Sequence, residues 1–259
     1  MTAVQNARQR ARAELEQVIK TVAGQHLADG GAAALSLRAV ARELGMASSA
    51  LYRYYPSRDA LLTALIIDAY DTVGSLAEQA DRQAEAAGGG AGARWLAVCR
   101  AVRGWAVDCP HDYALVYGSP VPGYAAPTDT VVPATRLSRV MALILFAAVD
   151  SGELRPPARP LPAPTLVTSA VIELVGRSLE APYDDLMERS LVLLASLVGT
   201  VSYLQFGHLH GALLDETAWF DRAMTVAAEG VGLDLPLDES SDEFIHESFH
   251  ESQHPPPES

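Results

Sequence analysis

The chain has 259 residues, of which 49% are hydrophobic and 20% are charged, so it can bury a sizeable core and is not globally disordered. The polar N-terminus has no apolar core of a secretory signal, and no apolar run reaches the roughly 18–20 residues of a membrane-spanning helix. We therefore expect a cytoplasmic protein with no membrane partner. The two cysteines, Cys99 and Cys109, make neither a disulfide framework nor a zinc site.

The net charge of −13 is distributed unevenly along the chain. Residues 1–62 hold eight basic and five acidic side chains, a net charge of +3, which leaves −16 for the remainder. A basic N-terminal part can face phosphates while the acidic part stays away from them. The sequence therefore remains compatible with nucleic-acid binding despite its overall acidity.

The first elements form a compact series of predicted helices. Apolar residues recur at helical spacing over about residues 8–29, and the glycines that follow can end this helix in a left-handed conformation. Ser36 can cap a second helix, which Gly45 ends after about two turns. A third short helix is expected over about 47–54, and Pro56 prevents it from continuing.

A longer fourth helix begins at the Ser57 cap and ends before the glycines at 88–90. The segment 155–164 contains five prolines and is predicted to be a connector. Further helical patterns occupy the ranges 95–105, 109–127 (a short helix between ordered loops), 132–149, 166–179, 183–213 and 216–229. We see no convincing strand alternation, so the predicted fold is all-α.

The range 183–213 is the longest of these helical patterns, and it is apolar on two faces. A helix of this kind is buried on two sides, so one face can pack on its own domain and the other on a second subunit. The sequence thus predicts a homodimer formed through the long C-terminal helices. The residues expected at the dimer interface are Leu191, Ala195, Val198, Tyr203 and Phe206.

The end of the chain is acidic. From Asp234 onward there are eight acidic residues and no lysine or arginine, which predicts a disordered tail over 236–259. We expect an N-terminal domain at 1–62 and a larger helical domain at 63–235. Neither the histidines at 208 and 210 nor those at 246, 250 and 254 indicate a metal site, and no catalytic constellation is present. The sequence therefore predicts no metal, no cofactor and no enzymatic activity.

The most informative stretch is SLRAVARELGMASSALYRYYPSRDALL at residues 36–62. It predicts two short helices joined by a tight turn at Gly45, which is the arrangement of a helix-turn-helix. The second helix of such a unit enters the major groove of DNA, roughly 12 Å wide, and the small residues at 47–50 would let its backbone approach the bases.

This stretch closely resembles the TetR/AcrR family of bacterial regulators, over about residues 8–62. The matching positions are Leu35-Ser36-Leu37-Arg38, Val40-Ala41, Leu44-Gly45-Met46, Leu51-Tyr52-Arg53-Tyr54-Tyr55, Ser57-Arg58 and Leu61-Leu62. The family more often has lysine where Arg58 stands and phenylalanine where Tyr55 stands. Arginine keeps the charge, so contact with phosphate is not endangered.

The resemblance implies a role for each residue of the expected DNA-binding set. Ser36 and Arg38 would touch the DNA backbone at the start of the second helix. Ser48, Ser49 and Ala50 would face base edges. Tyr52, Tyr54 and Arg58 would hold phosphates, and Arg53 would reach either. Packing is the alternative for Tyr52, and Ala50 can simply permit close approach.

The resemblance also implies that residues 63–235 form an effector-binding and dimerisation domain. Stretches at 105–124 and 206–211 look like a C-terminal subgroup common in high-GC bacteria, which leaves the ligand open. Aromatic residues of this region could line an apolar cavity with a few polar tips, although core packing is the alternative for each. The candidate pocket residues are Trp95, Trp105, Tyr113, Tyr117, Tyr124 and Phe146.

The function implied by the resemblance is that of a homodimeric repressor bound to a pseudo-palindromic double-stranded operator. A small apolar or amphipathic effector would bind the helical domain and release the DNA. The alternatives are a transcriptional activator, a regulator controlled by a protein partner, or a helical small-molecule-binding protein without a regulatory role.

Overall fold

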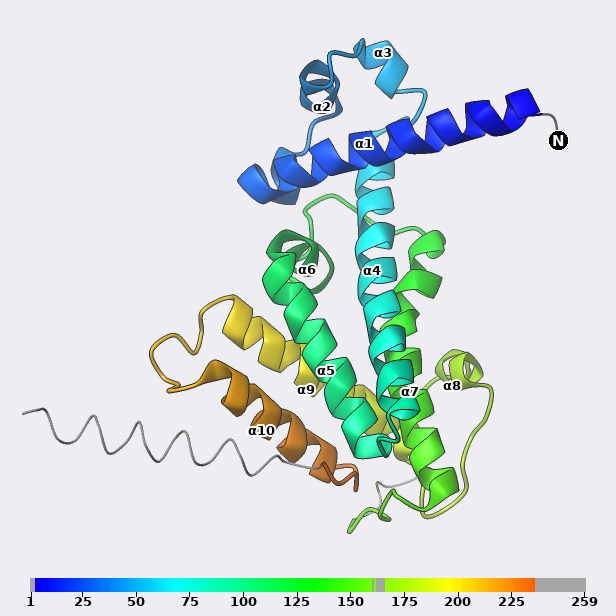
Figure 1. The fold of residues 1–259 in the computed structure, drawn as a ribbon, viewed down its shortest axis with the longest axis vertical. Helices are drawn as coiled ribbons and strands as arrows, with labels where there is room; N and C mark the ends of the chain where they lie inside the picture. Colours follow the sequence, from blue (N-terminus) through cyan, green and yellow to red (C-terminus); the bar gives the residue numbers. More distant parts are fainter. Residues whose placement is uncertain (1–2, 160, 162–165, 236–259) are drawn as a thin grey trace, which may run out of the picture. The chain divides into compact units, whose positions relative to one another are not determined.

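The structure is a computed structural model that describes residues 3–159, 161 and 166–235. Within these residues every regular element is a helix, which confirms the all-α prediction (Figure 1). The elements in chain order are α1 (Ala3–Ala34), α2 (Leu37–Glu43), α3 (Ser48–Leu51), α4 (Arg58–Ala86), α5 (Ala91–Asp108), α6 (Pro110–Tyr117), the 3-10 helix η1 (Thr128–Thr130), α7 (Val131–Ser151), α8 (Ser169–Val175), α9 (Leu186–Gln205) and α10 (Glu216–Glu229). The predicted acidic tail at 236–259 lies outside the described residues.

The chain forms two compact units. Unit 1 joins Met1–Gln79 with Ala101–Val140, and unit 2 joins Ala80–Arg100 with Met141–Ser259. Helices α4, α5 and α7 each contribute residues to both units. The division at residue 62, expected from the sequence, remains a prediction about how the chain is organised for function.

Helix α1 is longer than the sequence predicted, but the predicted glycine stop is present. Gly31 has φ 69° and ψ 174°, which breaks the helix and leaves a short turn before Leu35. Only glycine adopts this backbone conformation readily, because it has no Cβ. The break turns the chain back so that α2 packs against α1.

The core of unit 1 is built from the apolar faces of four helices. Their buried side chains form one cluster, and α6 also packs on α1. Figure 1 shows α1 lying across the first turns of α4, with α2 and α3 beside it. The fully or almost fully buried members are Ile19, Ala23 and Leu27 of α1, Leu35 between α1 and α2, Leu37, Val40 and Ala41 of α2, Leu51 of α3, and Leu61, Leu62, Leu65 and Ile66 of α4.

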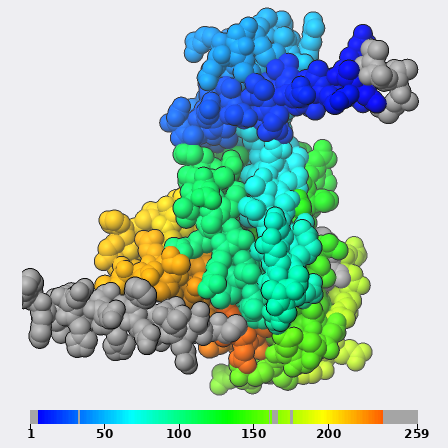
Figure 2. All heavy atoms as spheres, viewed as in Figure 1, coloured from blue at the N-terminus to red at the C-terminus, as the bar shows by residue number. Residues whose placement is uncertain are grey.

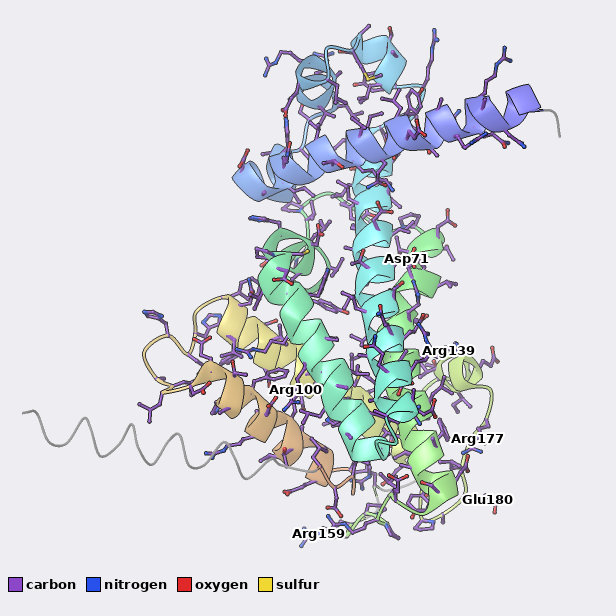
Figure 3. All side chains as sticks on the ribbon, viewed as in Figure 1. Asp71, Arg100, Arg139, Arg159, Arg177 and Glu180 are labelled. Carbon is purple, nitrogen blue, oxygen red and sulfur yellow. The ribbon has the colours of Figure 1, made fainter. Side chains whose placement is uncertain are left out.

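Unit 2 is held together by a second apolar core and by ion pairs between helices. Helix α10 packs on α9. Arg100 of α5 pairs with Asp221 of α10 at 2.6 Å, and Figure 3 shows Arg100 on the side of α5 near α10. Glu153 accepts a hydrogen bond from the backbone N–H of Ala91 at 2.7 Å, which caps α5 and lowers the pKa of this carboxylate.

The longest predicted helix is corrected by the structure. The pattern at 183–213 gives a helix only over Leu186–Gln205, and α1 is the longer element. Gly207 and Gly211 both have φ 73°, so the chain turns twice instead of continuing the helix. The spacing of apolar residues alone does not distinguish these turns from a continued helix.

Three helical stretches have the length and mean hydropathy of a membrane span, although no uninterrupted apolar run reaches that length. By length and composition alone, Arg58–Ala86, Thr128–Ser151 and Leu186–Gln205 could each cross a membrane. Small polar residues within these stretches interrupt the apolar runs in the sequence, while their mean hydropathy stays high. Each of the three is partly buried inside the protein: of its most apolar 18 residues, between 28% and 44% are buried.

Candidate nucleic-acid interface

Helix α2 begins at the serine that the sequence predicted as its cap. Ser36 has an extended backbone with φ −135°, and its hydroxyl accepts a hydrogen bond from the backbone N–H of Ala39 at 3.5 Å. The helix buries Leu37 and Val40, while Arg38 is exposed. Ser36 therefore contributes a structural hydrogen bond, and Arg38 is left available at the surface.

The turn between α2 and α3 depends on Gly45. Its φ of 62° lies in the left-handed region, and no other atom stands within 4 Å of a Cβ built there. After the turn, the N–H of Met46 donates to the carbonyl oxygen of Ala41 at 2.8 Å. The reversal brings α3 against α2. Backbone conformation, and not space, is what requires glycine at this position.

Helix α3 has one buried anchor and an outer face of small and polar residues. Leu51 is completely buried. Ser49 is exposed, and Ser48 and Ala50 are half-buried. In the space-filling view, α2 and α3 lie at the surface of unit 1 on the face shown (Figure 2). The short helix can therefore present its first residues to a groove while Leu51 fixes it to the core.

The residues that follow α3 divide into exposed and packed side chains. Tyr52 and Arg53 are exposed. Tyr54 is half-buried, packs against the core of unit 1, and stacks with Arg12, whose guanidinium carbon is 5.3 Å from the ring centroid. Tyr55 also packs on this core, and burial, with smaller contributions from nearby carboxylates, raises its pKa to about 12. Tyr55 is therefore a packing residue of unit 1.

Arg58 has structural contacts that the sequence did not indicate. Its Nη2 donates to the carbonyl oxygen of Ala32 at 2.6 Å, and its Nε donates to that of Leu35 at 3.2 Å. Its Nη1 lies 3.4 Å from Asp59. The guanidinium thus ties the first residue of α4 to the chain that connects α1 and α2. No local sequence signal could have revealed this, because the acceptors are carbonyls 23 and 26 positions away.

One ion pair and one hydrogen bond between side chains complete the frame around the helix-turn-helix. Lys20 of α1 pairs with Asp68 of α4 at 2.5 Å. His26 of α1 lies 2.7 Å from Glu43 at the end of α2. Each contact is partly exposed and contributes little stability by itself, but together they connect α1 to both neighbouring helices.

Four of the six predicted pocket residues lie in unit 1. Trp105, Tyr113 and Tyr117 form an aromatic cluster with Tyr70, with ring centroids 5.2–6.5 Å apart in the contacting pairs. The hydroxyl of Tyr70 donates to the carbonyl oxygen of Val116 at 3.3 Å. Burial raises the pKa of Tyr117, which keeps this phenol protonated. We call Tyr70, Trp105, Tyr113 and Tyr117 the aromatic cluster.

Tyr124 lies beside the same helix α4, outside the ring contacts of the aromatic cluster. Its hydroxyl is 2.9 Å from the hydroxyl of Thr63, and its ring packs against the core of unit 1. Trp95 is completely buried and belongs to unit 2. Among the described residues, the indole nitrogens of Trp95 and Trp105 are buried without a hydrogen-bond partner.

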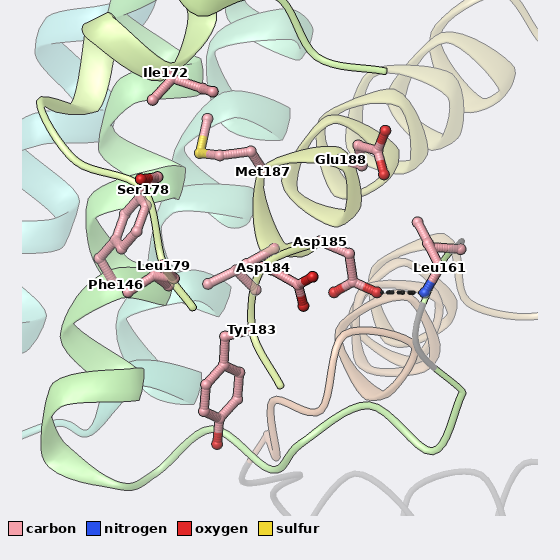
Figure 4. A pocket seen from close by; sticks show the side chains of 11 residues that line it. Phe146, Leu161, Ile172, Ser178, Leu179, Tyr183, Asp184, Asp185, Met187 and Glu188 are labelled. Atoms are coloured by element: carbon pink, nitrogen blue, oxygen red, sulfur yellow. Dashed lines mark hydrogen bonds between the residues drawn. The ribbon is translucent and has the colours of Figure 1, made fainter. Parts of the chain in front are cut away.

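Phe146, the sixth predicted pocket residue, lines a cavity of about 230 Å³ in unit 2 (Figure 4). Leu161 comes from the proline-rich connector and the other lining residues come from the segments around α8 and the start of α9, and sequence reasoning missed all of them. They are Leu161, Ile172, Ser178, Leu179, Tyr183, Asp184, Asp185, Leu186, Met187 and Glu188. They lie in or after the proline-rich connector, so no helical periodicity relates them to Phe146.

The outer face of α9 contains the residues predicted at a dimer interface. Leu191 is 40% exposed, Tyr203 is 56% exposed and Phe206 is 46% exposed. Ala195 is exposed and Val198 is half-buried. On the opposite face, the residues Leu193, Leu197 and Val201 are buried. The helix therefore has one face in the core of unit 2 and a second apolar face at the surface of the chain.

Comparison with protein families gives two matches. Residues 21–65 match the model of the bacterial regulatory proteins of the tetR family, and residues 95–227 match that of the tetracyclin repressor-like C-terminal domain. The chain is 39% identical over 217 residues to an HTH-type transcriptional regulator of Mycobacterium tuberculosis (strain H37Rv). The aligned region covers 81% of this chain and 88% of that protein. A regulator of Mycobacterium bovis is similar to the same extent.

Solved structures share the fold. The crystal structure of the regulatory protein SCO4313 has a TM-score of 0.64 and 29% sequence identity, and covers 85% of this chain and 98% of that one. A tetR-family regulatory protein from Rhodococcus RHA1 has a TM-score of 0.58 at 17% identity, with coverage of 84% and 97%. At this lower identity the second likeness concerns the fold alone.

Proposed function

The chain belongs to the TetR family of transcriptional regulators, a non-enzymatic family, and from this premise we propose that it is a homodimeric repressor. Two recognition helices would occupy successive major grooves of a pseudo-palindromic operator. Binding of a small apolar or amphipathic molecule would release the DNA. Such a protein would act in the cytoplasm, where its operator is.

The observation that carries the proposal is the exposed helix-turn-helix in a positively charged part of an acidic chain. Ser49, Tyr52 and Arg53 lie exposed at or just after α3, and Arg38 lies exposed on α2. We propose that Ser48, Ser49 and Ala50 face base edges, while Ser36, Arg38, Tyr52 and Tyr54 contact the phosphate backbone. Arg53 would reach either, and Arg58 would contact phosphate through the part of its guanidinium that its carbonyl partners leave accessible.

The exposed apolar face of α9 supports the proposed dimer. Large apolar side chains along one face of a surface helix are typical of a contact with another protein. Leu191, Ala195, Val198, Tyr203 and Phe206 follow one another at helical spacing on α9 and just after it. Packing this face against the same face of a second copy would remove it from water and give the two-fold symmetry that a palindromic operator requires.

The contacts of unit 1 suggest how an effector could act on the DNA-binding helices. Tyr70 and Thr63 belong to α4, and their hydroxyls contact α6 and the segment after it through Val116 and Tyr124. Helix α6 also packs on α1. A ligand inserted at the aromatic cluster would push α6 against α1 and α4 together. Because α4 is continuous from Arg58, this displacement would reach the base of the helix-turn-helix.

Operator binding can be tested with a DNA fragment that contains the upstream region of the gene for this protein. We expect binding to weaken on the order of 10³-fold between 50 and 200 mM salt, because a dimer with three basic contacts in each head would release about six counterions. Ser49→Ala should change the preference among operator variants, whereas Arg38→Ala should weaken binding to all of them by similar factors. Affinity independent of salt would contradict the proposal.

The effector response needs a separate measurement. Tyr117→Ala should open the aromatic cluster and change the ligand concentration that releases the fragment, relative to the affinity that the same variant has for the fragment in the absence of ligand. Candidate apolar molecules are titrated into the protein–DNA complex and release is followed by fluorescence anisotropy. A ligand that binds the protein and leaves the complex intact would contradict release as the mechanism.

A further inference from the structure

The cavity around Phe146 has apolar walls. Phe146 comes from α7, Ile172 from α8, Leu179 from the segment after α8, and Met187 from the first turn of α9. Figure 4 shows Ile172 and Met187 next to each other on one side, with Phe146 and Leu179 on another. With a volume of about 230 Å³, the cavity suits a compact small molecule.

The polar side of this cavity is acidic. Asp184, Asp185 and Glu188 all line it, and none of its described lining residues is a lysine, an arginine or a histidine. The carboxylates of Asp184 and Asp185 lie beside each other in Figure 4, while Tyr183 points away and donates to the carbonyl oxygen of Leu154 at 2.8 Å. Figure 4 shows Glu188 apart from these two carboxylates, next to Met187, so the three acidic side chains follow the start of α9.

The three carboxylates are not equivalent. Asp185 is almost fully buried and pairs with Arg189 through Nε at 2.9 Å and Nη2 at 2.7 Å. It also accepts from the N–H of Leu161 at 2.8 Å, and the pairing with Arg189 lowers its pKa. Glu188 accepts from the N–H of Leu166. Asp185 is thus neutralised by one arginine, whereas Asp184 and Glu188 add negative charge.

Arg177, which contacts the lining residue Phe146, does not neutralise this excess. Arg177 stacks on the ring of Phe146 at 4.8 Å from its centroid and pairs with Asp150 at 2.9 Å. Its charge is therefore matched by a carboxylate outside the cavity lining. The positive end of the α9 dipole corresponds to about half an elementary charge, which is less than the charge of Asp184 and Glu188 together.

We propose that this cavity binds a small organic cation, an ammonium group attached to a compact aromatic or aliphatic body. The ammonium would lie by Asp184, with Glu188 adding to the negative potential, and the body would fill the space between Phe146, Ile172 and Met187. An anionic ligand would be repelled by the same carboxylates. This site belongs to unit 2 and is distinct from the aromatic cluster of unit 1.

The test uses three probes of similar size and different charge with the full-length protein in the absence of DNA. Benzylammonium is the cation, benzyl alcohol the neutral analogue and benzoate the anion, and binding is measured by isothermal titration calorimetry. We expect benzylammonium to bind at least about fivefold more tightly than benzyl alcohol, and benzoate not to bind. Equal binding of the cation and the alcohol, or no binding of the cation, would overturn the proposal.

Substitutions at the cavity test whether the cation binds there. Asp184→Asn should weaken benzylammonium binding by up to about fivefold, the range of a partly exposed charge pair, and leave benzyl alcohol unaffected. Glu180→Gln is the matched control, because Glu180 is exposed and is not among the lining residues (Figure 3). Ile172→Phe should fill the cavity and abolish binding. An effect of Glu180→Gln equal to that of Asp184→Asn would show nonspecific attraction and overturn the assignment.

The outcome is separable from that of the proposed repressor role. Benzylammonium binding is measured without operator DNA, and operator binding is measured without benzylammonium. If Ile172→Phe proves unstable, the comparison of the three probes and the Asp184→Asn variant still decide the matter. A failure to bind operator DNA would contradict the repressor proposal and not the cation site. A failure to bind benzylammonium would contradict the cation site and not the repressor proposal.

Discussion

At the scale of single residues, Arg58 joins two roles in one side chain. The resemblance assigned it to phosphate, and the structure adds hydrogen bonds to the carbonyl oxygens of Ala32 and Leu35. Its planar guanidinium donates to the two acceptors from two different nitrogens, a fork geometry that the single nitrogen of a lysine does not reproduce. Arginine at this position therefore stabilises the connection between α1 and α2 in addition to providing charge.

We predict that Arg58→Lys lowers the free energy of unfolding by about 1–2 kcal/mol, because hydrogen bonds from a charged donor to partly buried carbonyls are lost. Urea unfolding followed by tryptophan fluorescence measures this. Arg53→Lys is the matched control, since Arg53 is exposed. Equal stability of the two variants would show that the carbonyl contacts contribute nothing measurable.

Tyr55 provides a prediction about pH. Its pKa is raised from 10.0 to about 12, chiefly by burial. A group whose pKa is higher in the folded than in the unfolded state contributes stability that is complete below pH 10 and is lost as the pH rises through 12. Tyr55→Phe removes this contribution, so wild type should lose more stability than the variant between about pH 10 and 12.

The measurement is urea unfolding of both proteins at pH 8 and at pH 11. Tyr70 and Tyr117 also have raised pKa values and remain in both proteins, so the difference between wild type and variant isolates Tyr55. Parallel loss of stability in the two proteins would contradict the burial argument.

At the scale of elements, the packing of α7 on α4 depends on a glycine. Arg136 of α7 pairs with Asp71 at 2.7 Å and Glu78 at 2.9 Å, both on α4, and Asp71 is marked in Figure 3. Between them, Gly74 is buried, and a Cβ there would stand 2.7 Å from the Cβ of Arg136. The close approach of the two helices is what allows the arginine to reach both carboxylates.

We predict that Gly74→Ala destabilises the protein by about 1–2 kcal/mol, although alanine is the better helix former, because the two helices must separate. Gly104→Ala is the control: this glycine is helical and exposed, and nothing lies within 4 Å of a Cβ built there. That substitution should stabilise by roughly 0.5–1 kcal/mol. Thermal unfolding of both variants checks the opposite signs, and a shared sign would refute the packing explanation.

At the scale of the whole molecule, the proposed function depends on two copies of the chain. The exposed face of α9 lies opposite a buried one, so much of its apolar surface stays in contact with water in the single chain. In the proposed dimer the same side chains would become buried, and the two DNA-binding heads would be held at a fixed separation. A monomer would bind one half-site only and lose most of its affinity for a palindrome.

We predict that Leu191→Arg converts the dimer to a monomer, as measured by analytical ultracentrifugation, and weakens operator binding by at least about tenfold. Val107→Arg is the control, since Val107 of α5 is 61% exposed and belongs to unit 1. A wild-type protein that sediments as a monomer would contradict the proposed assembly.

The sequence by itself determined the order of helices and the helix-turn-helix. The Ser36 cap, the glycine turn at 45 and the apolar periodicity of α1 and α4 act over at most a few neighbouring residues, so they can be read without a structure. The same locality explains the wrong end predicted for α9, where apolar spacing continued past Gly207 into turns that the periodicity could not distinguish from helix.

Only the tertiary structure decided which distant groups meet. Three contacts join segments that are far apart in the chain: the hydrogen bonds of Arg58 to two carbonyl oxygens, the aromatic cluster, and the acidic cavity around Phe146. Of the residues expected in one pocket, Tyr124 and Trp95 lie outside the aromatic cluster. Contacts of this kind depend on how whole helices pack, which no spacing of residues along the sequence specifies. For the same reason the family, carried by local motifs, could be read from the sequence, whereas the cavity and its charge could not.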